Sequence, residues 1–470
     1  MKERIKCWMA ALVAIIAVTA NAAWTFYPAE EGEKGVLTDG IWTLHAKLAK
    51  NSTDELEVNG SEGSFNGKEP SPINLTDIYD VDGKRYKAVA FETFTHHTYS
   101  SSTLSEHIDK LTEFIAPDCR KLAGSGCFKN CSVLTNVYLN SSVTNFANHR
   151  LFGGCSSLKL FYPRVLNIKQ VPVDVFYGCK ELTGEFSFPE CTGNNGGGSW
   201  FNGCTKIESV KMPLMTVIPG SSFNGCTNLK HVEFSKDLTH ISTYAFSGCT
   251  SLGGDLIRAM LNPKITKLGN NDTDVKYIFL NCSSFDGALE WNFPNLASTN
   301  VVGLSCFQGC TSLQKVVFKT YVYEIRGSAF CNLAPGAEIF MHPEPVKIFE
   351  SLSVGNAKGP FIKVYIDEES EDEWVDVIDK TYHVMRKENF NNRSWSDNDG
   401  TSTRSRDDMV ARMIEDQLMC TKDVNTGDVT INQRNVIAFC MQDKSGLDFW
   451  GYPCFWLIKK SKTGLKVIVR

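Results

Sequence analysis

Short stretches in which apolar and polar residues alternate recur along the middle of the chain. A single acidic residue separates Val232 from Phe234, and a single lysine separates Val210 from Met212. A period of two residues is that of a β-strand with one buried face. We therefore expect one short strand at each recurrence of the pattern.

Each alternating stretch follows the same motif, Phe-x-(Gly/Asn)-Cys-x-x-(Leu/Ile/Phe). The motif begins at Phe128, Phe152, Phe176, Phe201, Phe223, Phe246, Phe279 and Phe307. Its cysteines, spaced by 24, 24, 25, 22, 23, 33 and 28 residues, are Cys131, Cys155, Cys179, Cys204, Cys226, Cys249, Cys282 and Cys310. A degenerate ninth copy begins at Phe330, with Leu333 in the place of the cysteine. Self-similarity at a near-constant period indicates a repeat architecture.

The rest of each repeat predicts how the chain returns to the next copy. A second apolar pair, such as Leu238 and Ile241, follows a turn after the strand. The glycine that usually precedes the cysteine permits left-handed backbone angles at a tight corner. One such unit cannot bury its own apolar face, so neighbouring units must stack and pair their strands in a parallel sheet. We expect a β-rich solenoid of about nine coils, each 22–33 residues long.

The repeats resemble those of a known family. Tyr244–Leu252 (Tyr-Ala-Phe-Ser-Gly-Cys-Thr-Ser-Leu) and Ser222–Leu229 (Ser-Phe-Asn-Gly-Cys-Thr-Asn-Leu) are very similar to the repeat unit of the BspA-like leucine-rich repeat family. That family is common on bacterial cell surfaces. The resemblance covers about residues 88–335 and implies a leucine-rich repeat solenoid with its parallel sheet on the concave face. Members of the family are regarded as adhesion or recognition proteins, so the resemblance also implies a role in binding.

Both ends of the repeat region depart from the repeat. Residues 24–85 contain short alternating segments between Gly, Asn and Ser turns, which predict a small N-terminal β cap. The segment that leads to Trp374 resembles the capping coil that often ends the solenoid in the family, and Phe349 and Trp374 would cover the exposed core. Residues 407–470 combine a helical stripe with strand-like segments, which predicts a small C-terminal α+β or β domain.

The first residues are typical of a signal peptide. Lys2, Arg4 and Lys6 precede an apolar run from Trp8 to Ala20, which ends in the small-x-small sequence Ala20-Asn21-Ala22. The run is shorter than the 18–20 residues of a membrane-spanning helix. The predicted division is 1–22 signal peptide, 23–87 β cap, 88–340 solenoid, 341–380 capping coil, 381–406 linker and 407–470 C-terminal domain.

The charge balance excludes one class of function. The chain carries 48 Lys and Arg against 53 Asp and Glu, a net charge of −5. Nucleic-acid-binding proteins concentrate basic residues in a patch or stripe, and this chain has a similar balance along most of its length. We therefore expect no nucleic-acid partner. After signal cleavage we expect no membrane span either, and a secreted or cell-surface location.

The repeated cysteines are interpreted as a column of buried thiols. Zinc sites need closely spaced cysteine pairs with a matching second pair, which this spacing does not provide. Equivalent residues of stacked coils have parallel Cα–Cβ directions, whereas a disulfide needs two sulfurs that converge. Outside the column, Cys306 and Cys331 flank consecutive Phe anchors and are the first candidate disulfide. We predict no metal and no other cofactor.

The chain offers no constellation for nucleophilic catalysis. The nearest approach to a Gly-x-Ser-x-Gly elbow is Gly303–Phe307, in which Phe replaces the second glycine. Gly196–Gly198 lacks the Lys-Ser/Thr pair of a phosphate-binding loop. We predict a protein that is not an enzyme. Two alternatives stay open: a structural surface-layer component, and an enzyme with its site in the C-terminal domain.

The outward-pointing residues of the predicted strands are the candidate binding site on the concave face. They are Asn136, Tyr138, Leu160, Tyr162, Glu185, Ser187, Ser209, Lys211, His231, Glu233, Glu290, Asn292, Lys315 and Val317. Solenoid concavities offer large surfaces for macromolecules. We therefore expect an extracellular partner, protein or glycan, and the sequence does not separate these two.

The signal peptide predicts the start of the secreted protein. Cleavage after Ala22 would leave Ala23 as the first residue. Mass spectrometry of the exported protein should find its N-terminus at or near that residue, whereas an intact Met1 on a membrane-embedded species would contradict the prediction.

Overall fold

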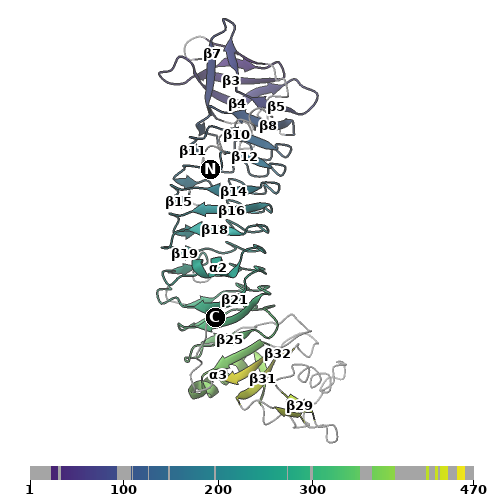
Figure 1. Ribbon diagram of the computed structural model, residues 1–470, viewed down its shortest axis with the longest axis vertical. Coiled ribbons are helices and arrows are strands. Elements are labelled where there is room, and N and C mark those ends of the chain that lie inside the picture. Colours follow the sequence, from purple (N-terminus) through teal and green to yellow (C-terminus); the bar gives the residue numbers. More distant parts are fainter. Residues whose placement is uncertain are drawn as a thin grey trace, which may run out of the picture. The chain divides into compact units, whose positions relative to one another are not determined.

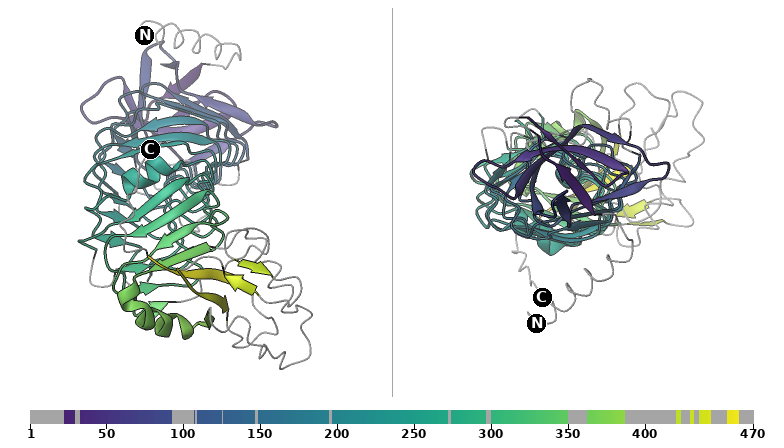
Figure 2. Two further views of the ribbon diagram at one scale, coloured as in Figure 1. Left: turned by 60° about the horizontal axis from the view of Figure 1, so that its bottom comes forward. Right: turned by 90° about the horizontal axis from the view of Figure 1, so that it is seen from above.

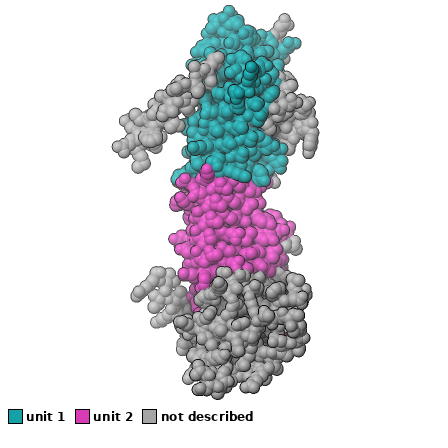
Figure 3. All heavy atoms as spheres, turned by 90° about the vertical axis from the view of Figure 1, so that its right-hand side faces the viewer, with its two compact units in different colours: residues 1–190 teal, residues 191–470 magenta. Residues whose placement is uncertain are grey.

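The alternating segments of the repeats form stacked strands in the computed structural model (Figure 1). The model describes residues 23–29, 33–92, 107, 109–124, 126–146, 149–194, 197–271, 274–296, 300–349, 362–386, 420–422, 429–431, 435–442 and 453–460. The chain divides into two compact units, unit 1 at Met1–Glu190 and unit 2 at Cys191–Arg470 (Figure 3). This division falls inside the predicted solenoid and coincides with none of the predicted domain boundaries.

Unit 1 begins with a closed barrel of strands. The first seven strands of the unit are β1 Trp24–Tyr27, β2 Gly35–Thr38, β3 Trp42–Leu48, β4 Glu55–Phe65, β5 Ser71–Asn74, β6 Ile78–Asp80 and β7 Arg85–Phe91, and all of them except β5 belong to the barrel. Because β6 pairs with both β1 and β7, the order β7-β4-β3-β2-β1-β6 closes into a barrel, seen end-on in the right view of Figure 2. Trp24, Phe26, Trp42 and Leu44 are buried in it.

The barrel and the first coils share their sheets. The remaining strands of unit 1 are β8 Leu111–Ala116, β9 Lys121–Leu122, β10 Asn136–Leu139, β11 Asn145–Phe146, β12 Leu160–Tyr162, β13 Gln170–Val171 and β14 Gly184–Ser187. Strand β7 pairs in parallel with β9, and β9 with β11, while β5 begins the parallel sheet β5-β8-β10-β12. Phe91 on β7 stacks on Phe128 with ring centroids 5.5 Å apart. No boundary therefore separates the barrel from the coils.

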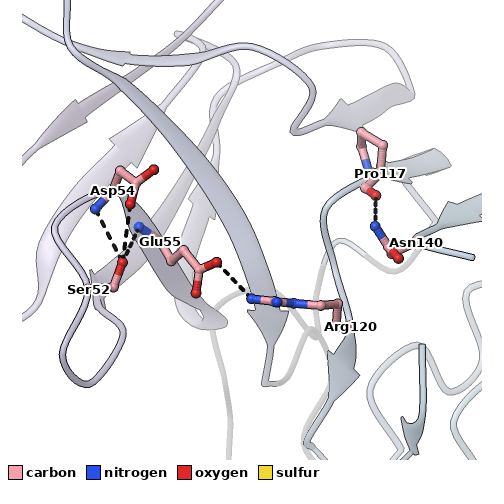
Figure 4. Close-up of polar contacts among 6 residues, drawn as sticks. All are labelled: Ser52, Asp54, Glu55, Pro117, Arg120 and Asn140. Atoms are coloured by element: carbon pink, nitrogen blue, oxygen red, sulfur yellow. Dashed lines mark hydrogen bonds and ion pairs between the residues drawn. The ribbon is translucent and has the colours of Figure 1, made fainter. Parts of the chain in front are cut away.

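Polar contacts add little to this junction (Figure 4). Arg120 Nη2 and Glu55 Oε1 lie 2.8 Å apart, but their side chains are 51% and 33% exposed, and exposed ion pairs contribute at most about 1 kcal/mol. Asn140 Nδ2 donates to the carbonyl oxygen of Pro117 at 2.7 Å. Strand pairing and apolar burial are therefore the main stabilising interactions at the junction.

Unit 2 repeats the two-strand coil. Its elements begin with β15 Gly193–Asn194, β16 Ile207–Met212, β17 Val217–Ile218, β18 His231–Phe234, β19 His240–Ile241, helix α2 Gly254–Met260 and β20 Lys267–Leu268. They continue with β21 Gly287–Trp291, β22 Val301–Val302, β23 Leu313–Phe318, β24 Glu324–Ile325, β25 Glu338–Phe340, β26 Ile348–Phe349 and β27 Ile362–Ile366. The last are the 3-10 helix η2 Glu368–Ser370, α3 Glu371–Asp379, β28 Tyr382–Arg386, β29 Cys420–Lys422, β30 Val429–Ile431, β31 Val436–Gln442 and β32 Pro453–Lys459. Strands β21, β23, β25 and β27 lie side by side in parallel (Figure 2, left).

One coil has a helix where the sequence predicted a strand. After Cys249 the chain forms α2, which buries Gly254, Ile257 and Met260. These residues are three apart, which is the spacing of one helix face and not of a strand. Asp255 in the first turn and Arg258 in the last turn suit the helix dipole. The 33-residue interval to the next cysteine provides the extra length.

The predicted linker and C-terminal domain need correction. Residues 382–386 form β28 and not a linker, and β32 pairs in parallel with β27, so the C-terminal strands extend the sheet of the coils. The edge of β27 would otherwise expose unpaired backbone groups. Phe349 and Trp374 are buried. Outside the described residues lie the predicted signal peptide, residues 387–419 and residues 461–470.

The Phe anchors of the motif stack on one another in each core. In unit 1 the ring centroids of Phe128, Phe152 and Phe176 follow at 5.3 and 5.7 Å, with interplanar angles of 6° and 13°. In unit 2 the centroids of consecutive Phe anchors, from Phe201 to Phe330, lie 5.3–5.9 Å apart. Stacked aromatic pairs stabilise beyond their buried area. The degenerate copy at Phe330 continues the stack.

Each corner contains two residues with left-handed backbone angles. One is the Gly or Asn before the cysteine, as at Asn130 with φ 62° and Gly154 with φ 83°. The other lies two residues before the Phe, at Gly126, Arg150, Asp174, Ser199, Ser221, Tyr244, Tyr277, Ser305 and Ser328. Most side chains disfavour this region. The second position is therefore imposed by the stacking of the coils and not by residue type.

The eight motif cysteines are buried thiols. Each Phe carbonyl oxygen accepts the backbone N–H of the cysteine in its own coil, as from Cys131 to Phe128 at 3.2 Å. At six of these carbonyls the same oxygen also accepts the S–H of the next coil, as from Cys155 Sγ to Phe128 at 2.9 Å and from Cys226 Sγ to Phe201 at 3.0 Å. One carbonyl thus uses both lone pairs to join two coils.

This bond recurs along both units. The further donors are Cys179 to Phe152, Cys249 to Phe223, Cys282 to Phe246 and Cys310 to Phe279, at 3.1–3.3 Å. Burial raises the pKa of Cys282 to about 12 and raises that of Cys249 and Cys310 well above the ordinary value. These three thiols therefore stay protonated and unreactive at neutral pH.

The candidate disulfide between Cys306 and Cys331 is not formed, since both residues are buried free thiols. Phe307 N donates to Ala329 O, and Gly309 N donates to Cys331 O. Cys306 directly precedes Phe307, and the stack aligns it with Ala329, which directly precedes Phe330. Cys331 instead follows Phe330 in the chain. The two cysteines therefore occupy different positions of the repeat and are not aligned by the stack.

The corner glycines give a matched pair of variants. A Cβ on Gly178 would have no atom nearer than 3.9 Å, whereas a Cβ on Gly154 would lie 2.2 Å from Asn130 Oδ1. Gly178→Ala should lower the free energy of unfolding by about 1–2 kcal/mol, the cost of its left-handed angle. Gly154→Ala should lower it further. Equal losses in urea unfolding would show that the asparagine of the neighbouring coil does not constrain the corner.

The thiol column predicts a reactivity pattern. Thiol titration of the native protein should give a low count because the cysteines are buried. Titration of the unfolded, unreduced protein should give at least the eight thiols of the column. A count near zero after unfolding would mean that the column is oxidised.

Candidate binding surface

We call the side chains of the main strands that point away from the core the outer face. In unit 1 this face is built on β8, β10 and β12, whose register aligns Asn136 with Leu160 and Tyr138 with Tyr162. All four side chains are half-buried. The structure therefore brings these four predicted residues together in two adjacent rows.

Glu113 extends the first row and was not predicted. It lies beside Asn136 in the register of β8 and β10, and its Oε1 accepts a hydrogen bond from Asn136 Nδ2. Burial, and then the charge of Glu113, raise the pKa of Tyr138. A protonated phenol both donates and accepts hydrogen bonds. Glu185 and Ser187 follow on β14, the first exposed and the second half-buried.

In unit 2 the outer face begins on β16 and β18. Their register aligns Ser209 with His231 and Lys211 with Glu233. Lys211, His231 and Glu233 are exposed, but Ser209 is only 1% exposed and its hydroxyl lacks a hydrogen-bond partner. The prediction that Ser209 is available to a partner is therefore wrong.

Helix α2 divides the outer face of unit 2. It contacts β18 on one side and β21 on the other, so the row that contains Glu233 does not continue directly to Glu290. Glu290 is exposed and pairs in register with Val317, while Lys315 pairs with Ala288. Asn292 lies just after the end of β21.

A cluster on β23, β25 and β27 was missed by the sequence analysis. Lys315 Nζ lies 4.4 Å from the ring centroid of Phe340, and this ring stacks on Tyr365 at 4.4 Å and 3°. The Tyr365 hydroxyl donates to Glu338 Oε1 at 3.0 Å. Burial, and then Glu338, raise the pKa of Tyr365. Glu338-Ile-Phe340 and Lys363-Val-Tyr365 repeat the alternation of the earlier strands, so this signal was present in the sequence.

The outer face offers aromatic, amide and charged side chains over a sheet. Within the described ranges, no group of three His, Cys, Asp or Glu residues could hold a metal ion. None of the helices among these residues is long and apolar enough to cross a bilayer. The chemistry of the face is that of hydrogen bonding and flat aromatic contact.

A family model for the BspA type leucine rich repeat region matches this chain over residues 93–183, 152–286, 197–335 and 275–353. Together these matches cover more than half of the chain. The chain belongs to the BspA-type leucine-rich repeat family. The family resemblance inferred from the repeat motif is thereby confirmed. A leucine-rich repeat fold with parallel strands is confirmed as well.

This BspA-type protein is also similar to solved structures. A leucine-rich repeat protein from Bacteroides ovatus is 19% identical over 72% of this chain and 96% of its own, with a TM-score of 0.35. A leucine rich cell surface protein from Faecalibacterium prausnitzii is 16% identical over 67% and 78%, with a TM-score of 0.34. A leucine-rich repeat protein of T. pallidum is 20% identical over 46% and 91%, with a TM-score of 0.33. No curated protein matches the chain.

Proposed function

We propose that this protein is an exported recognition or adhesion protein that binds an extracellular macromolecule through its outer face. The observation that carries the proposal is the alignment of Tyr138 with Tyr162, flanked by Asn136 and Leu160. Tyrosines supply rigid, amphipathic contact area at a low entropic cost, and aromatic residues are enriched in binding hot spots. The signal peptide predicted at residues 1–22 supports export, to the cell surface or to the medium.

The partner class follows from the shape of the repeat. A stacked sheet presents rows of side chains over several strands, which suits a protein or a glycan better than a small substrate. Family membership supports a surface-exposed repeat protein. The proposal includes no catalytic step.

The remaining parts of the chain are proposed to complete the solenoid. About nine coils would then stack, with the barrel of residues 23–87 as the N-terminal cap. The stacking of Phe91 on Phe128 supports this role, since a solenoid end exposes apolar core. At the other end, the capping coil of residues 341–380 and strands β31 and β32 would cover the last coils and the sheet edge.

The tyrosine pair provides the test. A binding screen against matrix proteins and glycans would first identify a ligand. The double change Tyr138→Ala and Tyr162→Ala should then weaken the binding free energy of that ligand by at least about 2 kcal/mol. Thermal unfolding should change little, because both rings are only half-buried. Tyr177→Ala is the matched control, since Tyr177 is 49% exposed but lies at a corner and outside the outer face. Unchanged affinity in the double variant with intact folding would contradict the proposal.

A further inference from the structure

The outward side of the N-terminal barrel carries a surface without Asp, Glu, Lys or Arg. On β1, Trp24 and Phe26 are buried in the barrel, so the alternating residues Thr25 and Tyr27 point outward. The same alternation turns residues of β2, β3 and β6 outward. We call the outward residues that strand pairing aligns on these four strands the barrel face: Thr25, Tyr27, Val36, Thr38, Thr43, His45 and Tyr79.

Strand register places the barrel face on one continuous surface. The first row, with one residue from each strand, is Tyr79-Thr25-Thr38-Thr43. The second row, from β1, β2 and β3, is Tyr27-Val36-His45. Aligned residues of neighbouring strands have Cβ atoms about 4.5–5.5 Å apart. By strand spacing, Tyr27 lies diagonally from Tyr79 at about 8 Å, so one ligand can contact both rings.

Charged residues border this face in pairs. Arg85 on β7 aligns with Tyr79, and its Nη2 lies 3.6 Å from Asp77 Oδ1. At the opposite border, Lys47 Nζ and Glu57 Oε2 lie 3.3 Å apart. The charges therefore lie beside the barrel face and not within it.

The barrel face offers both exposed rings and hydroxyl groups. Tyr27 is 48% exposed, Tyr79 37% and Val36 36%. Within the described ranges neither tyrosine hydroxyl has a hydrogen-bond partner, whereas Thr38 Oγ1 donates to the carbonyl oxygen of Trp42 at 2.7 Å. The tyrosine rings and their hydroxyls are therefore available to a partner.

This composition favours one class of partner. A neutral sugar ring has C–H faces and a rim of hydroxyl groups, which match flat apolar rings and hydroxyls that both donate and accept. An anionic ligand would need Lys or Arg, and binding to a membrane surface commonly uses basic residues beside large apolar side chains. Five of the seven residues carry a hydroxyl, which makes the face more polar than the core of a protein interface.

We propose that the barrel face binds a neutral polysaccharide, with sugar rings against Tyr27 and Tyr79. Its four strands span about 14 Å, so a chain of sugars contacts more of the face than a single sugar does. This surface lies on other strands than the outer face of the coils, and it gives the protein a second binding surface that does not depend on the first.

The test is affinity gel electrophoresis of the full-length protein in gels that contain one soluble neutral polysaccharide: hydroxyethyl cellulose, galactomannan or dextran. At least one of them should retard the wild-type protein. The double change Tyr27→Ala and Tyr79→Ala should weaken that binding at least tenfold. Tyr177→Ala is the matched control, since Tyr177 is 49% exposed but lies outside the barrel, and it should bind as the wild type does.

Two further measurements test the chemistry of the face. Val36→Lys places a charge at the centre of the second row without removing a ring, so it should also weaken binding at least tenfold. Exposed strand positions tolerate lysine, so this variant serves if circular dichroism shows that the double variant does not fold. Because the face is uncharged, binding by the wild type should be the same at low and high sodium chloride concentration.

Four outcomes would overturn the inference. They are no retardation by any of the three polysaccharides, equal retardation of the folded double variant, equal retardation of Val36→Lys, and loss of wild-type binding at high salt. Binding of the wild type but not of the double variant to phosphatidylcholine vesicles, without retardation by any polysaccharide, would assign the face to a membrane instead. None of these results bears on the outer face, whose test uses Tyr138 and Tyr162.

Discussion

The fold depends on one carbonyl group in each corner. The carbonyl of Phe128 accepts the backbone N–H of Cys131 in its own coil and the S–H of Cys155 in the next. An apolar residue in place of the cysteine would leave one lone pair of this buried oxygen without a donor, and buried polar groups are nearly always paired. A thiol meets both demands of the site, because it packs as a small apolar group and also donates a weak hydrogen bond.

Fixed corners leave the outer face free to vary. The stacked rings and thiols hold successive coils in register, so each main strand presents its outward residues beside those of its neighbour. This is why Tyr138 lies beside Tyr162 and Phe340 beside Tyr365, although their strands differ in sequence. A repeat of this kind separates the residues that fold the chain from those of the outer face.

The sequence predicted the features that recur in every coil and missed those that occur in a single coil. Phe, Cys and the Gly or Asn before Cys recur, so their roles could be inferred from one motif. The left-handed residue two places before Phe was missed, because Arg150, Asp174 and Tyr244 share no chemistry. Helix α2 occurs in one coil only, and the pairing of β27 with β32 joins segments distant in sequence. Ser209 alternates with the apolar positions of its strand, so the pattern alone did not indicate that it is buried.

Amide hydrogen exchange of the full-length protein tests most directly whether the corners hold the coils together. In the wild type, the corner amides that bond to the next coil, such as Phe201 N to Ser222 O and Phe223 N to Ala245 O, should exchange more slowly than those of the exposed residues Lys236 and Asp237. In Cys226→Ala, which removes the donor to Phe201 O, exchange should rise in the corners of residues 199–204 and 221–226 and remain low at residues 305–310. Corners that exchange as fast as the turns, or a uniform rise along the chain, would contradict the account.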